Sequence, residues 1–206
     1  MTAPTAETLR QACKALAAKD KVLATAFEHV GLPVWRTTEP TYQSLARIVV
    51  YQLISTKAAD AIWQRVVNTL GEVTAQSVLS HDPEALLASG LSRPKLKHLQ
   101  AIAAAIHSGS LELNSLRTAP IEDARQQLIN VRGIGPWTAD TFLMNAIGHL
   151  DAFPHGDVGL LEAYKLLSGA TERPNAKDFS RLAETWRPYR AVAAHLLYDW
   201  LNAGRT

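Results

Sequence analysis

The chain contains a single cysteine, Cys13, among its 206 residues. One cysteine excludes an intramolecular disulfide, a zinc site with several cysteine ligands and a four-cysteine iron–sulfur cluster. It is consistent with a reducing compartment. His155 has no second histidine or carboxylate at a suitable ligand spacing, so we predict that it lies in a loop and that the chain has no metal site of this kind.

The sequence also lacks a long hydrophobic run. No apolar stretch reaches about 18 residues, the length at which a membrane-spanning helix becomes a candidate. The first residues do not combine a basic start with an apolar core, which is the pattern of a secretory signal. We therefore expect no membrane partner and an intracellular location, in the cytoplasm and nucleoid or, in a eukaryote, in the nucleus. We also expect a monomer.

The sequence also has little excess of either charge. The 21 lysines and arginines nearly balance the 19 acidic residues, which leaves a formal net charge of +2. Without a polybasic tail, bulk charge cannot hold nucleic acid indiscriminately, so any contact with DNA must come from local placement of cations. The 47% of hydrophobic residues is enough to bury a substantial core.

Apolar residues follow helical spacing along most of the chain. In residues 41–55, for example, Leu45, Ile48, Val49 and Leu53 fall on one helical face. The alternation typical of strands is missing. The spacing predicts an all-α protein with helices at 41–55, 58–70, 83–89, 93–108, 121–131, 136–148, 157–168, 176–184 and 188–203.

A turn with two glycines is the most informative local pattern. Gly133 and Gly135 flank Ile134 between two segments with helical spacing. Such glycines let the chain reverse tightly with its backbone N–H groups facing outward, where an anion can bind. The same pattern also makes an ordinary turn between two helices. Taken alone, it leaves both interpretations open.

Four segments together resemble the helix-hairpin-helix base-excision DNA glycosylases, most closely the branch of 3-methyladenine DNA glycosylase II. Residues 131–139, VRGIGPWTA, resemble the hairpin, and residues 153–157 resemble the segment that ends in the catalytic aspartate. Residues 51–59 resemble the segment with the wedge side chain, and residues 90–95 resemble the second DNA-facing turn. All four occur in the family's order, which is more specific than any one motif.

The resemblance implies a two-lobed helical fold for residues 1–206 as one glycosylase unit. Residues 40–151 would form a six-helix lobe with the hairpin, and residues 1–39 with 152–206 would form the second lobe. Asp157 would then lie at the active-site cleft between the lobes.

The resemblance also implies which residues contact DNA. The hairpin residues would hold a phosphate through backbone N–H groups, and family members often place a monovalent cation there; we expect no other cofactor. Arg93 and Lys95 would contact DNA from the second turn, although a solvated helix face is the alternative for these two cations. The implied hairpin contacts are Gly133, Ile134, Gly135, Trp137 and Thr138.

Asp157 is the candidate catalytic residue by the same resemblance. Cleavage of an N-glycosidic bond gives the sugar oxocarbenium character, which a fixed carboxylate stabilises. The residue also precedes a helical segment, so it has a second interpretation as a helix N-cap. The two roles are compatible, because a helix N-terminus favours the ionised carboxylate that the reaction needs.

Four further side chains have two interpretations each. Trp137 stands where bifunctional relatives have a lysine that forms a Schiff base, and tryptophan cannot form an imine. It would line the base pocket together with Tyr198, with Trp200 as the second choice, or each would simply be core. Leu53 matches the apolar wedge that fills the gap left by the extruded nucleotide, whereas its helical spacing predicts a core residue.

These residues favour a monofunctional DNA glycosylase that acts on duplex DNA with a damaged base. The expected substrates are flipped alkylated purines of the 3-methyladenine and 7-methylguanine type, because a cationic ring suits an aromatic wall. Two alternatives stay open. One is a glycosylase for oxidised, deaminated or etheno purines, and the other is a non-catalytic helix-hairpin-helix module that only binds DNA.

Overall fold

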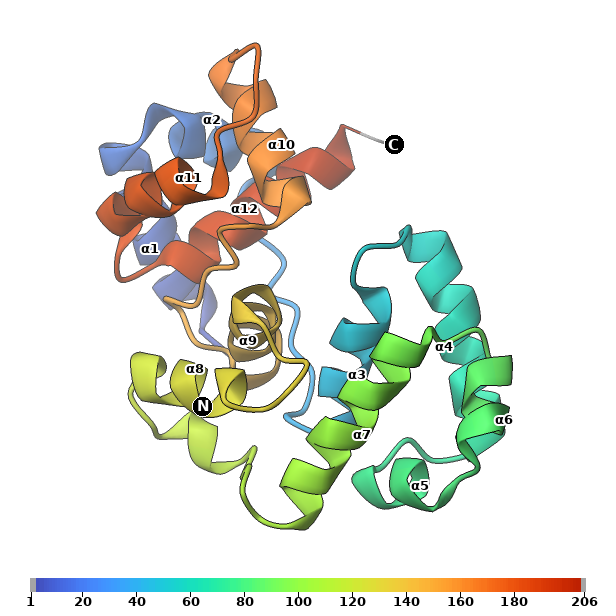
Figure 1. The fold of residues 1–206 in the computed structure, drawn as a ribbon. Helices are drawn as coiled ribbons and strands as arrows, with labels where there is room; N and C mark the ends of the chain where they lie inside the picture. Colours follow the sequence, from blue (N-terminus) through green and yellow to red (C-terminus); the bar gives the residue numbers. More distant parts are fainter. Residues whose placement is uncertain (1–2, 205–206) are drawn as a thin grey trace. The chain divides into compact units, whose positions relative to one another are not determined.

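The computed structural model describes residues 3–204, which form helices joined by short turns (Figure 1). No strand occurs in this part of the chain, so the predicted all-α class is confirmed. The α-helices of residues 3–204 are α1 (Ala6–Lys19), α2 (Lys21–Val30), α3 (Tyr42–Tyr51), α4 (Thr56–Leu70), α5 (Ala75–Ser80), α6 (Pro83–Ala88), α7 (Arg93–His107), α8 (Ile121–Ile129), α9 (Pro136–Phe142), α10 (Val158–Ser168), α11 (Ala176–Ala183) and α12 (Arg190–Ala203).

Contacts divide the chain into two compact units. One consists of residues 38–147 and contains α3 to α9. The other is built from the segments on either side and contains α1, α2 and α10 to α12. We call them the hairpin unit and the aspartate unit, because the first contains the Gly133–Gly135 turn and the second contains Asp157.

In the hairpin unit, α7 packs against α3 and α5. Its buried face consists of Leu96, Leu99, Ile102 and Ala103, which follow the i, i+3, i+6, i+7 spacing of an amphipathic helix. The helix begins after Ser92, whose hydroxyl accepts a hydrogen bond from the Lys95 backbone N–H. The start of α7 is therefore fixed by a cap as well as by its apolar face.

Helices α8 and α9 flank the two-glycine turn in the same unit. Arg125 of α8 donates two hydrogen bonds from Nε and Nη2 to Oδ1 of Asp140 in α9, at 2.9 and 2.5 Å. Asp140 is completely buried. Removing one partner of a buried charge pair leaves the other uncompensated, so this pair holds the two helices in one arrangement.

The aspartate unit has an aromatic core and a largely buried helix α12. Phe153, Phe179 and Trp186 meet with ring centroids 5.4 to 5.6 Å apart. Asp20 links this cluster to α2, because its carboxylate caps that helix at the Val22 N–H and also accepts a hydrogen bond from Trp186 Nε1 at 2.9 Å. The unit is thus tied together by side chains distant in sequence.

The predicted helices are correct in type, but three bounds differ in informative ways. The helix predicted over 41–55 ends at Tyr51, and the one predicted over 136–148 ends at Phe142 and continues as a π-helical segment, Leu143–Ile147. The last predicted helix begins at Arg190 rather than at residue 188. Helices α1, α2 and α5 were not predicted.

Candidate functional site

Leu53 lies in a short connection between α3 and α4 that we call the Leu53 loop, residues 52–54. It is the one non-glycine residue with positive φ in the described part of the chain, at 60°. Its side chain is fully exposed, with a relative accessibility of 102%. A left-handed conformation costs an L-residue about 1–2 kcal/mol. The core interpretation of Leu53 is therefore wrong: helical spacing continued past the residue at which the helix ends.

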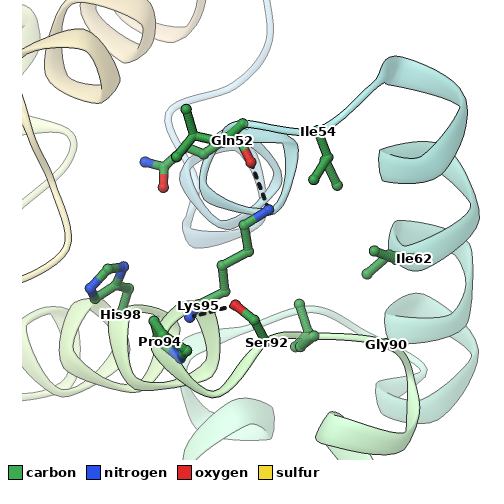
Figure 2. Close-up of a pocket in the computed structure, with 10 residues that line it drawn as sticks. Gln52, Ile54, Ile62, Gly90, Ser92, Pro94, Lys95 and His98 are labelled. Atoms are coloured by element: carbon green, nitrogen blue, oxygen red, sulfur yellow. Dashed lines mark hydrogen bonds between the residues drawn. The ribbon is translucent and has the colours of Figure 1, made fainter.

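Two side chains from other helices hold the Leu53 loop. The Lys95 ammonium donates hydrogen bonds to the carbonyl oxygens of Val50 and Gln52, at 2.7 and 2.8 Å (Figure 2). The Gln52 amide in turn donates to Thr138 Oγ1 at 2.6 Å. Lys95 thus directs two of the three N–H donors of its ammonium at the end of α3. The sequence predicted a DNA contact for this residue and gave no sign of this one.

The same region contains a pocket of about 360 Å³, lined by residues of the Leu53 loop, of α4 and of the start of α7. Figure 2 shows the Lys95 side chain crossing from α7 to the end of α3, with His98 one turn further along α7. Burial lowers the pKa of the Lys95 ammonium. Arg93, by contrast, is exposed in the first turn of α7.

The two glycines of the hairpin differ in what surrounds them. Gly133 has φ of 96°, and a Cβ placed there would lie 2.5 Å from Cβ and Cγ of His98. A side chain at Gly133 would therefore be held in a backbone conformation that is unfavourable for any residue but glycine, and it would also have to displace His98 of α7. Around Gly135 a Cβ would meet nothing within 4 Å. Glycine at that position leaves the outer side of the turn open.

The other hairpin residues divide between anchoring and surface positions. Ile134 is only 3% exposed, and its N–H donates to the Val131 carbonyl at 3.1 Å. Thr138 is buried and accepts the Gln52 hydrogen bond described above, while Trp137 is half-buried. Ile134 and Thr138 thus secure the turn to the core of the unit. Any contact that they make with DNA must go through the backbone.

The turn offers only backbone oxygens to a cation. Residues 131–136 have no carboxylate, hydroxyl or amide side chain. Backbone carbonyls such as that of Val131, which already accepts the Ile134 N–H, suit a weakly held monovalent ion and not a tightly bound divalent one. Elsewhere among residues 3–204, no three His, Cys, Asp or Glu side chains are grouped so that they could bind a metal ion.

Asp157 lies at the start of α10 in the aspartate unit. Its Oδ1 accepts a hydrogen bond from the Leu160 N–H at 3.1 Å, so the predicted N-cap geometry is present. The Tyr198 hydroxyl of α12 also forms a hydrogen bond with the Asp157 carboxylate. Burial, followed by the Asp157 charge and this hydrogen bond, raises the pKa of Tyr198 well above its usual value. The phenol therefore keeps its proton and acts as the donor.

The close approach of these two side chains depends on Gly159. A Cβ at this position would lie 3.1 Å from Asp157 Oδ1 and 3.5 Å from Tyr198 Cε1. His155 is half-buried in the turn before Asp157, as predicted for a loop residue, and Trp200 is half-buried on α12. Of the two aromatic candidates on α12, Tyr198 is the one that contacts the carboxylate.

A profile described as "HhH-GPD superfamily base excision DNA repair protein" matches residues 46–188, which include the Leu53 loop, the hairpin and Asp157. The chain belongs to this superfamily.

Solved structures with the same fold include DNA-3-methyladenine glycosidase from Bacillus halodurans. Its identity to this HhH-GPD chain is 33%, its TM-score is 0.78, and the match covers 94% of this chain and 89% of that one. The 3-methyladenine DNA glycosylase Mag1 of Schizosaccharomyces pombe, solved in complex with abasic DNA, has 26% identity and a TM-score of 0.80 over 91% of this chain and 95% of its own.

Curated relatives include the Bacillus subtilis protein YfjP, described provisionally as a DNA-3-methyladenine glycosylase. It is 27% identical over 84% of this chain. The HhH-GPD chain spans 62% of the length of YfjP. No helix in residues 3–204 is long and apolar enough to cross a membrane.

Within the hairpin unit of this HhH-GPD protein, three predicted DNA-facing segments are joined by side-chain contacts. The Leu53 loop meets α7 through Lys95 and meets α9 through Gln52. The start of α7 meets the hairpin through His98 and Gly133. In the aspartate unit the structure brings Asp157 and Tyr198 together.

Three residues that matter to this geometry were not singled out from the sequence. Gln52 lies inside residues 51–59, so the resemblance could have drawn attention to it. Arg125 and Asp140 gave no comparable signal, because each stands among other charged or polar residues and only the fold places them in contact.

Proposed function

We propose that this HhH-GPD protein is a monofunctional DNA glycosylase that hydrolyses the N-glycosidic bond of flipped alkylated purines in duplex DNA. The observation that carries the proposal is Asp157, fixed at the start of α10 by Leu160 and Tyr198 in a chain of this superfamily. A pure DNA-binding module gains little from a carboxylate held in this way, since DNA is itself an anion.

The chemistry follows from what surrounds the carboxylate. The first turn of α10 and the two hydrogen bonds all favour negative charge on Asp157. As the bond between base and sugar breaks, positive charge develops on the sugar, and a fixed carboxylate stabilises it. The same carboxylate can orient the attacking water. Because Tyr198 donates to it, the carboxylate has a restricted set of orientations before substrate binds.

The hairpin unit supplies the proposed DNA contacts. Arg93 lies in the first turn of α7, where no acidic residue offsets the partial positive charge of the helix end. A cation at that end is unfavourable for the isolated helix, whereas a phosphate bound there would be attracted both by Arg93 and by the positive end of the helix. Leu53 would enter the base stack and occupy the space of the extruded nucleotide. Gly135 would let the phosphate approach the turn closely.

Trp137 supports hydrolysis without strand cleavage. The residue after Gly135-Pro136 has no amine, so no Schiff base with the sugar can form there. Its half-buried indole is available as one wall of the base pocket. An alkylated purine is positively charged, which makes it a good leaving group and favours contact with an aromatic face. The relatives named above, glycosylases of 3-methyladenine, support this substrate class.

The test compares the wild-type protein with the Asp157→Asn variant on methylated duplex DNA, with the released bases identified by chromatography. Asparagine caps helices as well as aspartate does, so the variant keeps the start of α10. Loss of the negative charge should lower base release about 10²–10³-fold or more. The strand of the product should stay intact until alkali is added.

Two results would contradict the proposal. Equal release by the variant would show that Asp157 does not act in the reaction. Absence of release by the wild type, with duplex binding intact, would move the search to oxidised, deaminated or etheno purines and then to a binding module. Thermal unfolding of both proteins controls for a loss of structure.

A further inference from the structure

We propose that Lys95 is a positioning residue, which holds the Leu53 loop in the conformation that exposes Leu53; this inference rests on the proposed function. The loop joins α3 to α4 and presents a fully exposed leucine with φ of 60°. Neither the exposure nor the conformation is favourable for a free leucine. Something in the fold must therefore stabilise this arrangement.

The end of α3 shows what Lys95 contributes. The last carbonyls of a helix have no partner within the helix, and a glycine with positive φ commonly ends the helix so that they are satisfied. Helix α4, for example, ends at Gly71 with φ of 71°. Helix α3 has no such glycine, and the Lys95 ammonium bonds the carbonyls of Val50 and Gln52. These two carbonyls lie on either side of Tyr51, the last residue of the helix.

The ammonium bridges the helix and the loop. Val50 belongs to α3, whereas Gln52 is the first residue of the Leu53 loop, directly before Leu53 itself. One cation that bonds both carbonyls fixes the direction in which the chain leaves the helix. Cations also favour the C-terminal end of a helix through its dipole. The side chain is half-buried beside the pocket, where water competes less for these bonds (Figure 2).

The same helix face connects the loop to the hairpin. Lys95 and His98 are three residues apart on α7 and therefore lie on one side of the helix. Lys95 bonds the end of α3, and His98 lies against Gly133 of the hairpin. Gln52 of the Leu53 loop in turn donates a hydrogen bond to Thr138 of α9, the helix that follows the hairpin. Phosphate contact at the hairpin and presentation of Leu53 are thus coupled within one unit.

This role differs from the phosphate contact that the sequence predicted for Lys95. A phosphate ligand adds to the salt dependence of DNA binding, because each neutralised phosphate releases counterions. A residue that holds the loop acts on base extrusion and leaves duplex affinity nearly unchanged. The two roles therefore give different results when the ammonium is removed and the aliphatic chain is kept, as in Lys95→Met.

The experiment uses the full chain and compares Lys95→Met with Lys97→Met, a loss of an exposed charge on the same helix. Hydrogen exchange of the free proteins would be followed in peptides that cover the Leu53 loop. We expect exchange there to rise about tenfold in Lys95→Met only. Single-turnover release of methylated bases should fall about 10–100-fold. The slope of log affinity against log salt should not change.

A second variant gives a test that is independent of overall rate. If Lys95 acts through Leu53, Lys95→Met should add little to the effect of Leu53→Ala, because interacting residues are not additive. A slope reduced by about 0.9, with unchanged exchange in the loop, would make Lys95 a phosphate ligand and overturn the inference. Additive effects of the two substitutions would also overturn it. If exchange in the loop rises in Lys95→Met but the wild type releases no base, the role of Lys95 in holding the loop stands. The proposed function is then refuted.

Discussion

The two units hold their candidate functional residues in different ways. In the aspartate unit, Asp157 is fixed by its own helix and by one hydroxyl, that of Tyr198. In the hairpin unit, the conformation of Leu53 is fixed through its neighbour Gln52. Lys95 and Thr138, which bond Gln52, lie 43 and 86 residues from it along the chain. The helix cap of Asp157 is thus local and gains one bond from α12, whereas both side chains that hold the Leu53 loop come from other helices.

The difference follows from what each residue must do. An ionised carboxylate is stabilised by a helix N-terminus, so the local structure that positions Asp157 also favours its charge. An exposed leucine in the left-handed region opposes its local preference, and the surrounding structure must hold it. A strained position that persists in a fold is a candidate functional site. The comparison predicts that function and stability are aligned at Asp157 and opposed at Leu53.

The largest effect that would sharpen this comparison is expected from Leu53→Gly. Glycine adopts positive φ freely, so the folded state should be stabilised by about 0.5–1 kcal/mol, a net value after the greater freedom of glycine in the unfolded chain. Base release should fall about 10–100-fold, because nothing fills the gap left by the extruded nucleotide. Thermal unfolding and single-turnover kinetics would measure the two changes.

Leu53→Ala is the matched control for that variant. Alanine removes the side chain but keeps the unfavourable conformation, so it should lower base release without stabilising the protein. A glycine variant that is less stable than the wild type would show that Leu53 is not strained. Unchanged release by either variant would remove Leu53 from the reaction.

A smaller effect is expected in the aspartate unit from Tyr198→Phe. The change removes one hydrogen bond to Asp157 and keeps the ring, while the Leu160 N–H still holds the carboxylate. Base release should fall about tenfold, the lower end of what the loss of one hydrogen bond to a charged group gives, because the Leu160 bond remains. Trp200→Phe on the same helix is the control, and it should have the smaller effect. A loss as large as that of Asp157→Asn would mean that the local cap does not position the carboxylate by itself.

The sequence predicted the locally determined position much better than the other one. Asp157 before an apolar segment indicated both the helix start and the catalytic role, because a cap depends on residues within one turn. The end of α3 was missed, since apolar spacing cannot distinguish a core leucine from an exposed one. The bonds of Lys95 and Gln52 join segments far apart in the chain, and no short-range pattern predicts them.

Short helices illustrate the same limit. Helix α5 has six residues, too few for a repeat of apolar spacing, and it is stabilised by its capping box and by packing on α7. Helices α1 and α2 meet at Asp20, which ends one helix and caps the next. A break of one residue leaves little composition signal. Tertiary contacts set these elements, as they set the Leu53 loop.

The smallest expected effect is one on stability and concerns His195, which lies in α12 three residues before Tyr198. It is 2% exposed, neither ring nitrogen has a hydrogen-bond partner among the described residues, and its ring centroid lies 4.4 Å from that of Trp35. Burial lowers the pKa of His195 to about 4.

In the unfolded chain the ring protonates below a pKa of about 6.5, whereas in the folded protein it stays neutral down to about pH 4. The unfolded state therefore binds the extra proton between these values, and stability falls as the pH is lowered through this window. Denaturant unfolding at pH 7 and pH 5 should show that His195→Leu loses about 1–2 kcal/mol less stability than the wild type between the two values. An equal loss of stability in both proteins would mean that the buried His195 ring gains its proton in the folded state. Helix α12 would then be less firmly packed than the position of Tyr198 beside Asp157 requires.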